Sequence, residues 1–113
     1  MCTSLTYTSA TGHHFFARTM DFPTTTPWRP VFLPRHYHWE TALHVTRTTQ
    51  YAILGGGRIA ADFSAYLLAD GFNESGISCA ELYFPGVVDY APTPVAGQIN
   101  LTPQDFINWA LGE

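Results

Sequence analysis

The sequence has 113 residues, a length typical of one domain and too short for two. Hydrophobic residues make up 46% of the chain and charged residues only 12%, which excludes intrinsic disorder and leaves little polar coating for the surface. The basic residues are five arginines, and nine acidic residues bring the net charge to −4, which argues against a nucleic-acid partner. We therefore expect one folded unit, part of whose surface meets more protein.

No stretch of the sequence approaches the ~18 apolar residues of a membrane span, and the N-terminus lacks the features of a secretion signal. We therefore expect a cytoplasmic protein with no membrane partner. Thiols stay reduced in that compartment, so we expect no disulfide between Cys2 and Cys79. Cys79 is expected to be a small core residue.

The first part of the chain predicts strands and one long loop. Residues 2–8 and 14–20 are rich in β-forming residues and flank the turn signal Thr11-Gly12, which predicts a hairpin. Residues 23–34 contain four prolines and three consecutive threonines, so we expect a long loop there. Short, possibly paired strands are predicted at residues 37–40 and 43–47.

A further strand is predicted at residues 51–54, and the three glycines that follow are expected to stop it. Residues 65–69 and 77–84 flank residues 70–76, whose Asp, Gly and Asn content favours a tight reversal. This pattern predicts a second hairpin. Residues 85–97 are expected to be a Pro/Gly-rich connection.

The end of the chain predicts a helix. Thr102 can cap it, Pro103 suits its first turn, and Gly112 can terminate it. Asp105 would lie near the positive end of the helix dipole. The face expected to lie on a sheet comprises Phe106, Trp109 and Ala110. Antiparallel strands followed by one helix define an α+β fold.

Cys2 is the first residue with a possible chemical role. Removal of the initiator Met1 would leave one residue holding both a thiol and a free α-amino group. The reference pKa values are ~8.5 for the thiol and ~7.7–8.0 for the amine, so the amine can take the thiol proton near neutral pH. The residue could then attack an amide. The alternative is an incidental cysteine.

Arg18 and Asp21 lie at the end of the second predicted strand, and pairing in the hairpin would return them towards Cys2. The carboxylate could hold the α-ammonium group, while the guanidinium could lower the thiol pKa and orient Asp21. The alternative is an ordinary surface ion pair, which contributes little to stability.

His36, His38 and His44 suggest a metal site, since alternate residues of a strand share a face. A third ligand at a secure spacing is missing, so we expect no metal.

Residues 55–58 resemble a phosphate-binding loop only loosely, because no Lys-Ser/Thr pair follows them. We therefore expect a turn at these residues. No cofactor is expected.

Five motifs occur together in an order that resembles the N-terminal part of the choloylglycine hydrolase family, which contains bile salt hydrolases and penicillin V acylases. They are Met1-Cys2-Thr3, residues 16–22 (FARTMDF), 70–77 (DGFNESGI), 82–86 (LYFPG) and 100–112 (NLTPQDFINWALG). Each motif is weak alone, but five in this order are a strong signal, and the resemblance runs from Met1 to the last residue. The least matched stretch is 23–57.

The resemblance implies an αββα sandwich of the N-terminal-nucleophile hydrolase type, whose members cleave linear amides without a cofactor. Carried over by position, it makes Cys2 the nucleophile and Arg18 and Asp21 the pair beside the thiol. Tyr83 falls at a position that contributes to the oxyanion site, with Asn typical of bile salt hydrolases and Tyr of penicillin V acylases. The motif around Arg18 reads Ala-Arg-Thr where the family usually has Gly-Arg-Asn.

Family enzymes are several-fold longer, and a further Asn and Arg of their active site lie beyond the matched part. We therefore expect residues 1–113 to be the N-terminal portion of a single amidohydrolase domain. The expected substrate is a small-molecule amide, either a penicillin V-like acyl amide or a conjugated bile salt. The alternative is a non-catalytic truncated fragment. In either case we expect a homo-oligomer or a complementing C-terminal segment.

Overall fold

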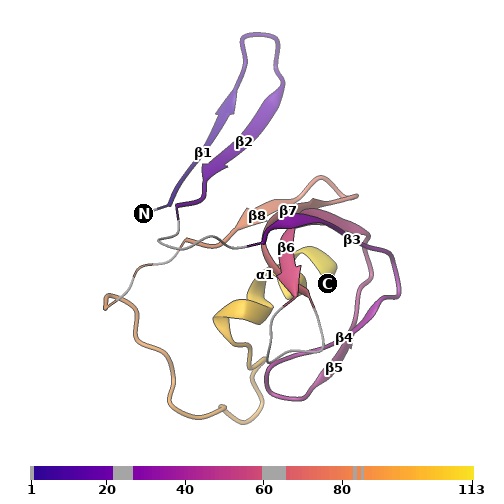
Figure 1. Cartoon of the computed structure of the whole chain (residues 1–113), viewed down its shortest axis with the longest axis vertical. Coiled ribbons are helices and arrows are strands. Elements are labelled where there is room, and N and C mark those ends of the chain that lie inside the picture. The colour runs from indigo at the N-terminus through magenta and orange to yellow at the C-terminus, as the bar shows by residue number, and fades with distance from the viewer. Residues whose placement is uncertain (1, 22–26, 60–65, 83, 85) are drawn as a thin grey trace.

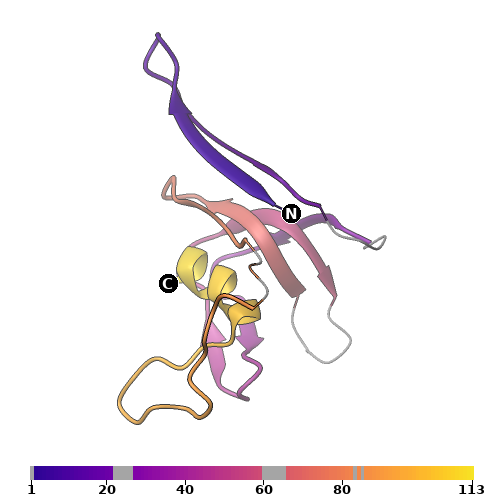
Figure 2. The same ribbon diagram turned by 90° about the vertical axis from the view of Figure 1, so that its left-hand side faces the viewer.

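A computed structural model of the chain describes residues 2–21, 27–59, 66–82, 84 and 86–113. These residues form a hairpin on one side, a four-stranded antiparallel sheet in the middle, and one helix against the opposite face of that sheet (Figure 1, Figure 2). A short two-stranded ribbon lies beside the helix (Figure 1). The prediction of antiparallel strands followed by a helix is confirmed.

The hairpin consists of β1 (Thr3–Thr8) and β2 (His14–Thr19), paired antiparallel over their full length. Its turn is closed by the backbone N–H of Gly12, which donates to the oxygen of Ser9 at 3.0 Å. Gly12 has a φ of 84°, a left-handed conformation that glycine adopts without strain. The predicted first hairpin is therefore confirmed.

The four-stranded sheet has the strand order β3-β6-β7-β8, and all its pairs are antiparallel. The predicted second hairpin is confirmed as β7 and β8, but its turn is shorter than expected. Residues 70–73 belong to β7, and the reversal follows Asn73, whose side-chain oxygen accepts from the backbone N–H groups of Ser75 and Ile77. The strands are β3 (Arg29–Leu33), β6 (Ile53–Ile59), β7 (Tyr66–Asn73) and β8 (Ser78–Ala80).

The prediction of a loop over residues 23–34 is wrong in its second half, where the chain forms β3. Residues 22–26 lie outside the described part of the chain. β3 is an edge strand, and an edge strand tolerates Pro30 because one of its sides carries no ladder. The proline content excluded a central strand but not an edge strand.

The expectation that the glycines after residue 54 stop the strand is also wrong, because β6 runs through them. They allow β6 and β7 to approach closely. A Cβ at Gly55 would overlap the backbone oxygen of Asp70, and a Cβ at Gly71 would lie 2.9 Å from the oxygen of Leu54. Glycine therefore serves backbone packing here.

β7 contains a bulge at Ala69. Gly56 pairs with Asp70 and Gly57 pairs with Leu68, so the register skips Ala69. Leu68 belongs to the core cluster beneath the helix, whereas the Asp70 side chain reaches the hairpin. The bulge thus places a core residue and a charged residue on opposite faces of one strand.

The ribbon consists of β4 (His38–Glu40) and β5 (Thr46–Thr48), which pair antiparallel. The predicted pairing of residues 37–40 with residues 43–47 is confirmed, with the second strand beginning later than expected. The ribbon is tied to the helix end by an ion pair between Arg47 and Glu113, with 2.6 Å between Nη1 and Oε2.

The helix, α1 (Pro103–Gly112), has the predicted bounds and starts after Thr102. The Asp105 carboxylate accepts from the backbone N–H and the hydroxyl of Thr102, the latter at 2.7 Å. It also accepts from the backbone N–H of Ala42 at 3.2 Å, which ties the ribbon to the first turn of the helix.

The helix buries a different face from the one predicted. Phe106 is 46% exposed, whereas Ile107 and Leu111 are fully buried against the sheet. The sequence contains two neighbouring apolar stripes, and the buried stripe includes Asn108, which a search for apolar residues passes over. The core cluster comprises Val31, Leu33, Ile53, Leu68, Ile107 and Leu111.

Large apolar side chains remain exposed on both strand layers, as the low charge content suggested. On the sheet face that is turned away from α1 they include Phe32, Leu54 and Phe72, which lie opposite one another on neighbouring strands. On the hairpin they include Tyr7 and Phe15, whose rings stack with centroids 4.8 Å apart. The described residues thus contain apolar surface that a further layer would bury.

Candidate active site

The hairpin register places Cys2 and Arg18 on one face. Cys2 immediately precedes β1, and Ser4 pairs directly with Arg18. Directly opposed residues of an antiparallel pair share a face, and so do alternate residues of one strand, so Cys2 lies diagonally across from Arg18. The end of the hairpin is closed by the backbone N–H of Thr3, which donates to the Thr19 hydroxyl at 3.1 Å.

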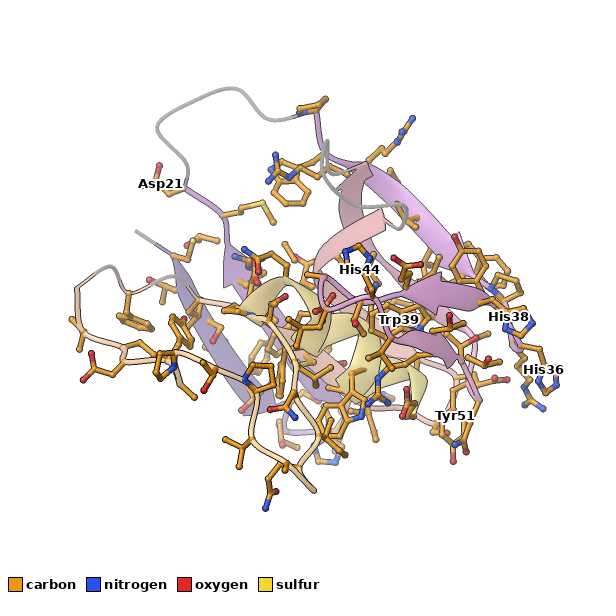
Figure 3. The ribbon with its side chains drawn as sticks, turned by 90° about the horizontal axis from the view of Figure 1, so that it is seen from below. Asp21, His36, His38, Trp39, His44 and Tyr51 are labelled. Carbon is orange, nitrogen blue, oxygen red and sulfur yellow. The ribbon has the colours of Figure 1, made fainter. Side chains whose placement is uncertain are left out.

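Asp21 follows β2 and is exposed. Figure 3 shows its side chain where the chain leaves β2, directed away from the four-stranded sheet. The structure shows an ion pair between Arg18 and Asp70, and the expected orienting effect of Arg18 on Asp21 stays a prediction.

Arg18 anchors the hairpin to the sheet. Its side chain is only 7% exposed, and Nη1 donates to Asp70 Oδ2 and to the backbone oxygen of Ala69, each at 3.2 Å. The other oxygen of Asp70 accepts from the backbone N–H of Gly56 at 3.0 Å. The Nε–H of Arg18 is buried with no hydrogen-bond partner within the described residues, so one donor stays open to a further acceptor.

Two more charged residues lie near this pair. Burial raises the pKa of the Glu81 carboxyl, and the neighbouring Asp70 acts in the same direction, while the guanidinium groups of Arg18 and Arg58 oppose both. Arg58 also lies over the ring of Trp28, with its guanidinium carbon 5.9 Å from the ring centroid. The Arg18–Asp70 ion pair thus has a second cation and a second carboxyl group within electrostatic range.

An open groove of about 630 Å³ lies between β2 and the face of the sheet opposite α1. Its walls are mostly apolar, and the Arg18–Asp70 ion pair lies in its lining. Such a groove suits an apolar group attached to a polar bond. The lining includes Phe16, Arg18, Trp28, Leu54, Asp70 and Phe72.

The two thiols differ in their surroundings. Cys2 is partly exposed at the hairpin end, and Cys79 packs against the core cluster. Burial raises the pKa of the Cys79 thiol, which makes it a poor nucleophile. Both are free thiols, as expected, and the packing of Cys79 agrees with its predicted structural role.

Tyr83, the fourth predicted site residue, lies outside the described residues. Its predicted role at an oxyanion site stays a prediction.

The three histidines do not form a metal site. His38 Nδ1 lies 2.8 Å from the Thr48 hydroxyl, and His44 Nδ1 lies 2.6 Å from Glu40 Oε1. Figure 3 shows His36 and His38 at one end of the molecule and His44 well apart from them. Among the described residues, no group of three His, Cys, Asp or Glu side chains could hold a metal ion. The loosely phosphate-loop-like residues 55–58 lie within β6.

The sequence analysis missed Asp70 and Glu81. Asp70 begins the Asp-Gly pair that was assigned to a turn, and no local signal reveals its role, because Asp21 lies much nearer to Arg18 in sequence. None of the helices in the described part of the chain is long and apolar enough to cross a membrane.

Comparison with known proteins identifies the family. The family model for linear amide C–N hydrolases, choloylglycine hydrolase family, matches residues 2–113. The bile salt hydrolase/transferase of Clostridium perfringens is 36% identical over 98% of this chain and 33% of its own length. The conjugated bile acid hydrolase of Lactobacillus gasseri is 30% identical over 96% of this chain and 34% of its own length.

Solved structures agree with this match. The C2A mutant of the conjugated bile acid hydrolase from Clostridium perfringens superimposes with a TM-score of 0.88 at 34% identity, over 99% of this chain and 34% of that one. An R18L variant of the same hydrolase gives 0.86 at 32% identity, with the same coverage. The chain thus spans about a third of the length of these relatives. It belongs to the choloylglycine hydrolase family of linear amide C–N hydrolases.

Proposed function

We propose that the protein of which residues 1–113 form the N-terminal portion hydrolyses linear amides with Cys2 as nucleophile. The observation that carries this proposal is the hairpin register, which gives Cys2 and the buried cation Arg18 a common face. A nearby cation favours the thiolate over the thiol. The relatives' names, bile salt hydrolase and conjugated bile acid hydrolase, support the amide class of substrate.

The reaction requires removal of Met1, which frees the α-amino group of Cys2. That amine takes the thiol proton, and the sulfur attacks the amide carbon to form a C–S bond. The α-ammonium group then protonates the leaving nitrogen, the C–N bond breaks, and an acyl thioester remains. Water attacks the thioester, releases the carboxylic acid and regenerates the thiol. No metal or cofactor takes part in these steps.

Asp21 and Tyr83 have distinct proposed roles. Asp21 holds the ammonium form of the Cys2 amine by charge attraction. The Tyr83 hydroxyl donates to the oxyanion that forms on the amide oxygen, and its ring packs on the acyl group. An aromatic ring at this position favours penicillin V-like phenoxyacetyl amides over conjugated bile salts. Replacing Tyr83 by Asn is expected to shift the ratio of the two hydrolysis rates towards bile salts.

A second candidate function is a non-catalytic fragment that works only with a complementing chain. The exposed apolar side chains on the hairpin and on the sheet support this candidate. It predicts that the 113 residues alone self-associate and hydrolyse nothing. The complementing surface would come from a C-terminal segment or from another copy. Either protein would act in the cytoplasm, where Cys2 stays reduced.

The test uses the isolated chain and a chimera in which residues 1–113 replace the matching third of the Clostridium perfringens hydrolase. Mass spectrometry first establishes that Met1 has been removed, and chromogenic phenoxyacetyl and glycine-conjugated bile salt amides serve as substrates. We expect the Cys2→Ser change to reduce hydrolysis by orders of magnitude, because a hydroxyl ionises far less readily than a thiol.

The matched control is Cys79→Ser, which removes the buried thiol and is expected to cost stability but spare turnover. Unchanged turnover in the Cys2→Ser chimera would disprove the nucleophile assignment. A chimera that is inactive with an intact, Met1-free Cys2 would favour the non-catalytic fragment.

A further inference from the structure

We infer that Asp70 is a positioning residue for Arg18: it fixes the guanidinium group on the Cys2 face of the hairpin and thereby raises the thiolate fraction of Cys2. This inference rests on the proposed function, in which Cys2 is the nucleophile. It assigns a role to Asp70, which begins the motif at residues 70–77 but was given no chemical role in the sequence analysis.

The first support is geometric. Arg18 lies on the hairpin and Asp70 on β7, and the ion pair between Nη1 and Oδ2 at 3.2 Å links these two layers. Arg18 also donates to the backbone oxygen of Ala69, which in turn accepts from the backbone N–H of Glu81 at 3.0 Å. The guanidinium is therefore held by fixed backbone as well as by the carboxylate.

The second support is that Asp70 is itself held in place. Its Oδ1 accepts from the Gly56 N–H at 3.0 Å, while Oδ2 receives Arg18. A Cβ at Gly56 would lie only 2.8 Å from Oδ1, so the carboxylate occupies the space that a side chain would need. The bulge at Ala69 turns this carboxylate towards the hairpin while Leu68 stays in the core. The local backbone is shaped around the Asp70 carboxylate.

Besides Asp21, which follows β2 on the hairpin itself, charged groups near Arg18 come from two further elements. Arg58 on β6 and Glu81 after β8 both act on the same electrostatic cluster as Asp70. They remain unchanged in the test variants described below, so they contribute equally to every measurement.

The two conceivable roles of Asp70, neutralising Arg18 and positioning Arg18, predict opposite changes in the pKa of the Cys2 thiol when Asp70 is removed. If Asp70 only neutralised Arg18, its removal would strengthen the positive field at Cys2 and lower the thiol pKa. If Asp70 positions Arg18, its removal lets the guanidinium drift, and the attraction weakens with distance, so the thiol pKa rises. The direction of the change therefore separates the two roles.

The experiment measures the pH dependence of Cys2 alkylation by iodoacetamide in the full chain, in a Cys79→Ser background that leaves a single thiol. Asp70→Asn removes the charge with little change of shape. Gly56→Ala keeps every charge but displaces the Asp70 carboxylate. Arg18→Leu removes the cation and sets the full size of the effect.

The matched control is Glu74→Gln. Glu74 also accepts from an arginine and from a backbone N–H, with 2.6 Å to Arg35 Nε and 2.7 Å to Ala52 N, but it lies in the turn after β7. We expect Asp70→Asn and Gly56→Ala to raise the alkylation midpoint by roughly half a pH unit or more, within the range set by Arg18→Leu, and Glu74→Gln to leave it unchanged.

A fall or no change in the midpoint for Asp70→Asn or Gly56→Ala would overturn the inference, as would an unchanged midpoint in Arg18→Leu. Thermal unfolding checks each variant, and if one of the two test variants loses its cooperative transition, the other decides. Alkylation needs no turnover, so a shifted midpoint in a protein that hydrolyses no amide would retain the positioning role of Asp70 and refute only the proposed function.

Discussion

The side-chain amide of Asn73, at the end of β7, donates a hydrogen bond of 2.9 Å to the backbone oxygen of Leu111 in the last turn of α1. Asn73 is buried, and its side-chain oxygen accepts from two backbone N–H groups of the following turn. One side chain therefore closes the β7–β8 turn and satisfies a carbonyl near the helix end, which otherwise has no intrahelical donor.

Replacing Asn73 by Ala is expected to lower the free energy of unfolding by about 2–4 kcal/mol, because it leaves buried backbone groups without partners. Denaturant unfolding measures the change. Asn100→Ala is the matched control: Asn100 also makes three hydrogen bonds to backbone, but in an exposed loop where water can replace them. Equal losses in the two variants would contradict the prediction.

The buried face of α1 can be tested with two truncations. Leu111→Ala is expected to cost about 2–5 kcal/mol, since Leu111 is fully buried and its removal leaves a cavity. Phe106→Ala removes a larger side chain that is 46% exposed, so it should cost much less. Thermal unfolding of both variants checks the order, and a larger loss for Phe106→Ala would restore the face predicted from sequence.

Glu74 should make stability depend on pH in the acid range. The hydrogen bonds from Arg35 and from the Ala52 N–H lower the pKa of Glu74 from 4.5 to about 2. A carboxyl with a depressed pKa stabilises the fold above its unfolded pKa and loses that contribution as pH falls towards its folded pKa. We expect Glu74→Gln to have the lower melting temperature at pH 6, and the gap to shrink between pH 4.5 and 2. A constant gap over that range would exclude this role for Glu74.

Glu81 should show the opposite sign. Burial raises the pKa of its carboxyl, so its ionisation opposes folding, and stability declines as pH rises through the folded pKa. Glu81→Gln is therefore expected to raise the melting temperature at pH 7, with no gain well below pH 4.5, where the carboxyl is protonated in both states. A lower melting temperature at pH 7 would mean that the attraction of Arg18 and Arg58 exceeds the cost of burial.

Local signals predicted the elements whose geometry is decided locally. The first hairpin depends on β-forming residues around Gly12, and the helix begins and ends at Pro103 and Gly112, as the capping residues indicate. β3 and the glycine-rich part of β6 were missed because their conformations depend on neighbours. Pro30 is tolerated because β3 lies at an edge of the sheet. Glycine is needed at position 55 because the backbone oxygen of Asp70 on β7 lies where a Cβ would be.

The candidate site likewise has one part that follows from local sequence and one part that depends on long-range packing. The hairpin alone brings Cys2 and Arg18 to one face, so that part of the site follows from the sequence. The partner of Arg18 is far away in the chain, and a sequence read from residue to residue favours the nearer Asp21 over Asp70. Long-range charge pairs of this kind become visible only when the layers are assembled.

The bulge at Ala69 also governs how β7 responds to a change of length. Adjacent residues of a regular strand point to opposite faces, so deleting Ala69 would leave Leu68 in the core and Asp70 on the hairpin side, still opposite Gly57 and Gly56. The deletion would instead remove the backbone oxygen that accepts from Arg18 and from the N–H of Glu81. Substitution of the small side chain keeps that oxygen and is the milder change. The extra residue of β7 therefore contributes its carbonyl group to the contact between hairpin and sheet, and the alternation of core and charged side chains does not depend on it.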